Sequence, residues 1–190
     1  MAIATKLFPW GALVALALPL AAQAALPDLC VLAPAIEPAN PQAIPTARSP
    51  LSRPTLFVRE PLAELRIERG STLLWSWSSR AGEPLDGPLA WPLPPLQPGQ
   101  TLTLRLRPAG APPDQFATIQ LIGATAQRLR EGDRLFQSLL SRPGAWNTAI
   151  DALLDKGDRS LATALLFAHE GPSDPNLNAL RLLVAQQSCR

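Results

Sequence analysis

Proline is spread unevenly along this chain, and its spacing limits where helices can form. The sequence has 22 prolines, and seven of them fall between residues 27 and 54. Because proline lacks an amide hydrogen and fixes its own backbone angle, this spacing disfavours helix and favours extended chain. Beyond Pro113 the sequence contains only Pro143, Pro172 and Pro175, so long helices become possible there.

The first 24 residues have the features of an export signal. Lys6 provides a positive charge, an apolar run covers residues 7–20, and Ala22-Gln23-Ala24 has the small residues that precede a cleavage site. We therefore expect residues 1–24 to be a signal peptide and the remaining chain to be periplasmic or secreted. The apolar run is shorter than the roughly 20 residues that cross a bilayer, so no stable membrane span is expected after cleavage.

The two cysteines, Cys30 and Cys189, lie near opposite ends of the chain that would remain after cleavage. An exported chain meets an oxidising compartment, in which thiols pair. We therefore expect a disulfide between them, which would fasten the N-terminal segment to the last helix. Two unpaired cysteines near the chain ends are the alternative.

Residues 54–122 have the pattern of short β-strands. Apolar and polar side chains alternate along residues 100–107, which indicates a strand with one buried face. Along residues 72–77, the same alternation places Leu73, Trp75 and Trp77 on one face. Strands are expected at residues 55–59, 63–68, 72–77, 89–93, 100–107 and 116–122. So many short strands predict a compact sandwich or an open barrel, and a small antiparallel β-sandwich is the expected form.

The apolar residues after residue 123 repeat at helical spacing instead. Four helices are expected, beginning near Ala126, Trp146, Asp158 and Asp174, and the last two of these residues are suitable N-caps. The predicted fold class is α+β, a sandwich followed by a helical bundle. The expected organisation is a signal peptide (1–24), a proline-rich extended segment (25–53), a β-sandwich module (54–122) and a helical region (123–190).

The run Leu96-Gln97-Pro98-Gly99-Gln100-Thr101-Leu102 before an alternating strand resembles the turn and strand of fibronectin type III and related immunoglobulin-like modules. In that family, the position of Leu102 usually holds a tyrosine, and this sequence has none. The middle part of the chain is also similar to sandwich modules of bacterial envelope proteins of unknown function. The resemblance implies a binding or spacer module and transfers no catalytic residue.

The composition limits the chemistry that this chain can perform. It has one histidine, two cysteines and no tyrosine, and it lacks both a Gly-x-Ser-x-Gly nucleophile motif and a glycine-rich phosphate loop. Asp151, Asp155 and Asp158 could share one side of a helix, but we expect them to be solvated rather than to bind a metal. The formal net charge of +2 does not favour nucleic acid as a partner. We expect no catalytic residue, no cofactor and no metal.

Five residues form the candidate binding surface. Trp75, Trp77 and Trp91 could be core residues or a surface on which sugar rings stack. Arg105 and Arg107 share the polar face of their strand and could form a cationic patch with Arg66, although ordinary solvated arginines would give the same pattern. The expected function is a non-catalytic interaction or assembly module that contacts an envelope protein. The alternative is a carbohydrate-binding module that uses the tryptophans.

Overall fold

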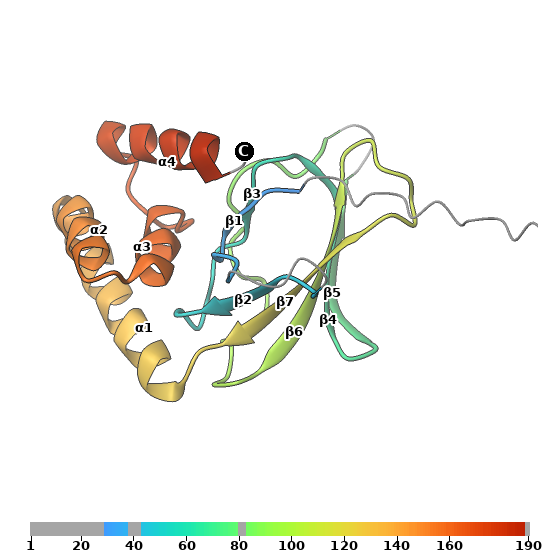
Figure 1. Cartoon of the computed structure of the whole chain (residues 1–190), viewed down its shortest axis with the longest axis horizontal. Coiled ribbons are helices and arrows are strands. Elements are labelled where there is room, and N and C mark those ends of the chain that lie inside the picture. The colour runs from blue at the N-terminus through green and yellow to red at the C-terminus, as the bar shows by residue number, and fades with distance from the viewer. Residues whose placement is uncertain (1–28, 38–42, 80–82, 189–190) are drawn as a thin grey trace, which may run out of the picture.

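The computed structural model describes residues 29–37, 43–79 and 83–188. Within these residues the fold is mixed α+β, with two β-sheets followed by a group of helices (Figure 1). The strands are β1 (Val31–Ala33), β2 (Thr46–Ser49), β3 (Phe57–Val58), β4 (Leu62–Arg69), β5 (Thr72–Ser78), β6 (Thr101–Pro108) and β7 (Ala117–Gly123). The helices are α1 (Ala126–Leu140), the 3-10 turn η1 (Pro143–Ala145), α2 (Trp146–Asp155), α3 (Arg159–Leu166) and α4 (Pro175–Ser188).

The larger sheet contains five strands in the order β2-β7-β6-β4-β5. Its neighbouring strands are antiparallel except for β2, which runs parallel to β7. The strands β1 and β3 form a separate antiparallel pair. This pair lies between the helices and the larger sheet (Figure 1). The mixed α+β class is therefore confirmed.

The core of the larger sheet follows from the alternation along β6. Leu102, Leu104 and Leu106 are at most 1% exposed, and the register places Leu104 and Leu106 beside Ile67 and Leu65 of β4. The strand prediction for residues 100–107 is thus confirmed. The remaining members of this sheet core include Ala47, Leu56, Val58, Leu62, Leu96, Ile119 and Leu121.

A β-bulge in β5 changes the face of one predicted residue. Trp77 pairs with Leu65 and Trp75 pairs with Ile67, so both indoles lie on the inner face. The register then shifts, and Leu73 pairs with Glu68. Because a bulge inserts one extra residue into a strand, alternate side chains on its two sides face opposite sides of the sheet. The prediction that Leu73 shares the face of the tryptophans is therefore wrong, and this side chain is 53% exposed.

Residues 89–93 do not form the predicted strand. They contribute a single bridge, between Leu89 and Leu56, and Trp91 and Pro92 have no strand assignment. Pro92 and the prolines that follow cannot donate to a strand ladder, which explains why pairing stops after one bridge.

The proline-rich segment packs against the fold. It supplies both β1 and β2, and it buries Leu32, Ala33, Ala47 and Leu51. At Ser49, which is fully buried, the hydroxyl donates to the carbonyl of Leu51 at 2.7 Å. The extended backbone predicted from the prolines is therefore used for strand pairing.

The helices begin where the sequence predicts. The Asp158 carboxylate accepts from the Leu161 amide at 3.2 Å, and the Asp174 carboxylate accepts from the Leu177 amide at 3.0 Å. Both side chains thus cap helix N-termini. The helix α2 ends just before Gly157. This glycine has a positive φ of 74°, the conformation in which glycine ends helices.

A second core holds the helices together, and we call it the helical core. Trp146 is 1% exposed, donates from Nε1 to the Leu165 carbonyl at 3.2 Å, and meets the Phe136 ring edge-on. Leu32 and Leu51 of the proline-rich segment also belong to this core. The helices are therefore joined to the sheet through residues of the proline-rich segment.

Two predicted features lie outside the described residues. These are the signal peptide at residues 1–24 and Cys189. None of the helices in the described ranges has both the length and the apolar character that a membrane crossing requires.

Candidate functional site

Three arginines meet on the face of the larger sheet opposite the sheet core. Arg66 of β4 lies directly across from Arg105 of β6, and Glu64 lies across from Arg107. Because side chains alternate along a strand, these four groups share one face, while their neighbours Leu65, Leu104 and Leu106 lie on the other. We call Arg66, Arg105 and Arg107 the arginine cluster.

Phe116, just before β7, is the platform of the arginine cluster. The distance from the guanidinium carbon to the centre of this ring is 4.7 Å for Arg66, 4.9 Å for Arg105 and 6.0 Å for Arg107. The three cations cover the ring so well that Phe116 is 8% exposed. Such contacts are favourable because the face of an aromatic ring is negative. Stacking also leaves the N–H edges of a planar guanidinium available to bind anions.

Glu64 bonds to the two outer arginines. Its carboxylate accepts from Arg66 Nε at 2.7 Å and from Arg107 Nη2 at 3.0 Å. Burial raises the pKa of this carboxyl, but the hydrogen bonds and charges of Arg66 and Arg107 outweigh that effect and place the pKa below its usual value. Glu64 is therefore ionised near neutral pH, and the cluster with its carboxylate keeps an excess of two positive charges.

Arg105 is the member without a carboxylate partner. Its Nε is buried and has no hydrogen-bond acceptor within the described residues. Like charges directly opposite each other on antiparallel strands are destabilising, and Arg105 stands opposite Arg66. The fold thus holds two cations opposite each other, and the contact of Arg105 with the Phe116 ring offsets part of their repulsion. A positive group with free donors next to two others can bind an anion.

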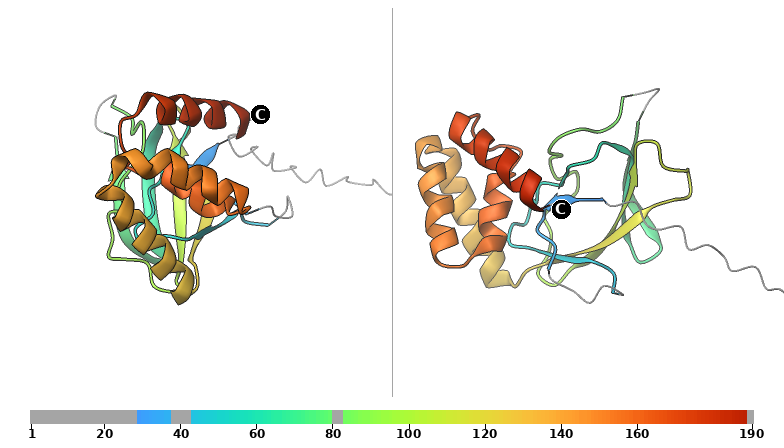
Figure 2. Two further views of the ribbon diagram at one scale, coloured as in Figure 1. Left: turned by 90° about the vertical axis from the view of Figure 1, so that its left-hand side faces the viewer. Right: turned by 45° about the horizontal axis from the view of Figure 1, so that its top comes forward.

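The arginine cluster lies away from the helices. Figure 1 shows the helices on the left and β4 and β5 on the right, and the helix contacts with the sheets involve β1 and β2. The right-hand view of Figure 2 likewise shows the helices on one side and the larger sheet on the other. Among the described residues, the main helix contacts thus do not involve β4, β6 or β7, the strands that form this face.

The structure brings together only some of the predicted binding residues. Arg105 and Arg107 meet Arg66, as the alternation predicts, whereas Trp75 and Trp77 lie on the opposite face of the sheet. Trp91 is half-buried, packs against the sheet core, and donates from Nε1 to the carbonyl of Pro94 at 3.0 Å. Trp75 packs against the sheet core. The tryptophans and the arginines therefore cannot form one surface.

Two members of the site were missed by reasoning from the sequence alone. Phe116 was expected to begin a strand, and Glu64 was seen only as a polar position in an alternating pattern. The sequence does hold a signal for Phe116. It lies two and four residues before Thr118 and Gln120, which face away from the core, so alternation along the strand places its ring on the same face. The tertiary position of its ring depends on the pairing of β6 with β7, which the sequence does not specify by itself.

The other charged residues singled out in the sequence have structural roles. Asp158 caps α3 and forms an ion pair with Arg128, whose Nη2 donates to Oδ2 at 2.6 Å. Asp151 and Asp155 are exposed. Over the described ranges, no group of three or more histidine, cysteine, aspartate or glutamate side chains could hold a metal ion.

Comparisons with known protein families, with curated proteins and with solved structures find no match to this chain. Its function is therefore inferred from the geometry of its own residues.

Proposed function

We propose that this chain is an exported, non-catalytic interaction module of the bacterial envelope, and that its arginine cluster contacts an acidic surface on a partner protein. The observation that carries the proposal is the guanidinium of Arg105, which stacks on Phe116 beside two other cations and forms no ion pair with a carboxylate of the described residues. An acidic partner would supply the carboxylate that this group lacks.

The rigidity of the cluster supports a binding role. Phe116 and Glu64 hold the guanidinium groups in place before any partner arrives. A group that is already ordered loses less conformational entropy on binding. Charge complementarity at such a surface would raise the association rate and select acidic partners over others.

Export and module type belong to the same proposal. Residues 1–24 would direct the chain out of the cytoplasm and be removed, as their composition predicts. The strands would form a sandwich similar to fibronectin type III modules, in which the β1–β3 pair is the smaller layer. A carbohydrate-binding role through the tryptophans is less well supported, because Trp75 and Trp77 lie on the inner face of β5.

The test is binding of an acidic peptide to the purified chain, measured by fluorescence anisotropy at low and high salt. Wild-type protein should bind a glutamate-rich peptide, and salt should weaken the binding by screening the charges. Arg105→Gln should weaken it several-fold, and circular dichroism should show that the variant still folds, because the Phe116 ring keeps its contacts with Arg66 and Arg107.

Arg130→Gln is the matched control, since Arg130 is an exposed arginine of α1, away from the cluster. It removes the same charge and should leave peptide binding nearly unchanged. Equal loss in both variants would mean that net charge, not the cluster, drives binding. That result, or unchanged binding by Arg105→Gln, would contradict the proposal.

A further inference from the structure

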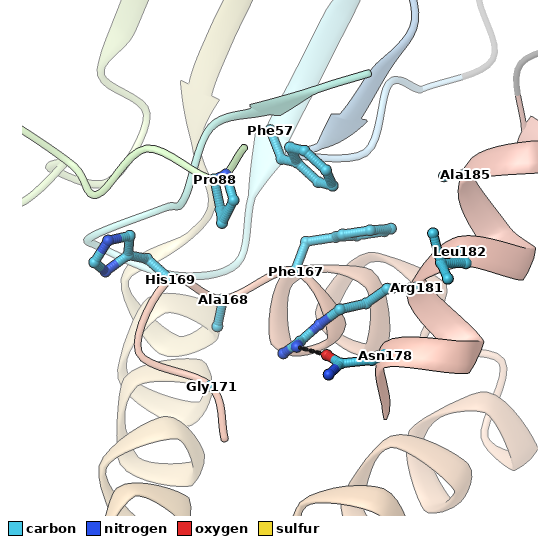
Figure 3. A pocket seen from close by; sticks show the side chains of 10 residues that line it. All are labelled: Phe57, Pro88, Phe167, Ala168, His169, Gly171, Asn178, Arg181, Leu182 and Ala185. Carbon is cyan, nitrogen blue, oxygen red and sulfur yellow. Dashed lines mark hydrogen bonds between the residues drawn. The ribbon is translucent and has the colours of Figure 1, made fainter. Parts of the chain in front are cut away.

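A second site, which shares no residue with the arginine cluster, lies between α4 and the segment that follows α3. It is a cavity of about 390 Å³, a size typical of small-molecule sites. Phe57 and Pro88 come from the sheet side, and Phe167 and Leu182 come from the helical side (Figure 3). The cavity is therefore built where the two parts of the fold meet.

Most of the cavity wall is apolar. The rings of Phe57 and Phe167 have centres 5.2 Å apart and planes inclined by 51°. Leu182 lines the cavity and is 65% exposed, so no other part of the described chain covers it. Ala185, one helical turn further along α4, extends the same wall (Figure 3). An apolar group of a ligand would contact these side chains and cover them from water.

One cation enters this apolar cavity. Arg181 of α4 donates from Nε to the Leu166 carbonyl at 2.6 Å and from Nη1 to Asn178 Oδ1 at 2.8 Å. Both acceptors are uncharged, and no carboxylate within the described chain lies close enough to form an ion pair with this guanidinium. Burial lowers the pKa of Arg181, and the charge of Asp174 opposes that effect.

Gly171 makes room for the guanidinium. A Cβ at this glycine would lie 2.8 Å from Arg181 Nη2, closer than such atoms approach. Nη2 also makes no hydrogen bond within the described residues. The third nitrogen of the guanidinium group is therefore held beside the cavity with its donors unused. His169 lies at the end of the cavity away from α4 and does not approach Arg181 (Figure 3).

We propose that this cavity binds a small carboxylic acid with an apolar tail, such as a medium-chain fatty acid. The carboxylate would accept from the free edge of Arg181, and the tail would pack between Phe57, Phe167 and Leu182. A neutral apolar molecule would leave the guanidinium without its counter-charge, and a cationic one would be repelled. The ligand class follows from charge complementarity and is independent of the acidic partner proposed for the arginine cluster.

The experiment measures binding of octanoate and of 1-octanol to the purified full chain by isothermal titration calorimetry, below the concentrations at which either aggregates. Octanoate should bind more tightly than the alcohol. Arg181→Met removes the charge and keeps an apolar side chain, so it should weaken octanoate about tenfold, as expected for a lost charged hydrogen bond. Its affinity for 1-octanol should stay the same.

A second pair of variants keeps the test decisive if Arg181→Met does not fold. Leu182→Glu places a negative charge on the cavity wall and should abolish octanoate binding. Leu183→Glu is the matched control: Leu183 is the next residue of α4, is 48% exposed and does not line the cavity. The proposal is overturned if the two glutamate variants bind octanoate equally well, or if wild-type protein binds 1-octanol as tightly as octanoate.

Discussion

The two hydrophobic cores differ in how they are assembled from the sequence. All but one of the fully buried residues of the sheet core lie between residues 56 and 121, and the exception is Ala47. The helical core combines residues from two distant parts of the chain: Leu32, Ala33 and Leu51 belong to the proline-rich segment, and the others lie between residues 139 and 177. The proline-rich segment therefore links the two cores, so neither is expected to unfold alone.

The strongest test of this link is a pair of large core truncations. Trp146→Ala removes the largest side chain of the helical core and should cost about 3–5 kcal/mol, while Leu104→Ala in the sheet core should cost about 2–5 kcal/mol. Because the cores are joined, each variant should still unfold in one transition. Urea denaturation followed by circular dichroism and by tryptophan fluorescence would measure this. Non-coincident curves in Trp146→Ala would mean that the helices melt separately.

The proposed disulfide between Cys30 and Cys189 would fasten the same two ends of the chain. Cys30 packs against the helical core, as do Val184 and Ala185 near the end of α4, and the last turn of α4 lies near β1 (Figure 2). Cys30→Ser should lower the free energy of unfolding by about 2–4 kcal/mol, the usual range for losing such a bridge.

The disulfide prediction has a direct chemical check. Thiol titration of the denatured, unreduced protein should find no free thiol, and a reducing agent should destabilise wild-type protein as much as the serine substitution does. Detection of two free thiols in protein purified from the periplasm would contradict the pairing.

A smaller effect is expected where α1 touches the proline-rich segment. A Cβ at Gly132 would lie 2.2 Å from the Pro50 carbonyl oxygen, so Gly132→Ala should force the two apart and cost about 1–3 kcal/mol, as overpacking does. Gly144→Ala is the control, because a Cβ there meets nothing within 4 Å. Thermal melts of both variants would measure the difference, and equal stability would show that this contact does not hold α1.

The helices could be predicted closely because their signals are local. The start of α1 at Ala126, the cap at Asp158 and the Asp174-Pro175 start of α4 depend on side chains within one turn of the helix end. Strands are different, since the bulge that turns Leu73 outward arises from pairing with β4. The strands β1 and β2 were missed because prolines favour extended chain without indicating which strand it will pair with.

The candidate site was predictable in part for the same reason. Alternation along β6 places Arg105 and Arg107 on one face, and alternation along β4 does the same for Arg66. The sequence does not show that Phe116 lies beneath all three or that Arg105 lacks a carboxylate. Both facts depend on strand order. The cavity at Arg181 was missed entirely, because Phe57 and Leu182 are brought together only by the tertiary fold.

The smallest expected effect concerns Glu64, which links the site to the stability of the sheet. Its pKa in the folded chain is below the usual value of 4.5, so the ionised form stabilises the fold. This contribution is fully present above pH 4.5 and is lost as the pH falls through the lowered pKa. The melting temperature of wild-type protein should therefore decrease on acidification below pH 4.5.

The substitution Glu64→Gln isolates that contribution from the other carboxylates. The variant should be less stable than wild-type protein at neutral pH, and the gap should close as the pH falls, because protonation removes the same charge from wild type. Glu170→Gln, at an exposed position after α3, should run parallel to wild type throughout. A gap that stays constant with pH would mean that Glu64 acts by packing. In that case, Arg66 and Arg107 would be held chiefly by their stacking on Phe116, and the sheet face would keep its geometry at any charge state of the carboxylate.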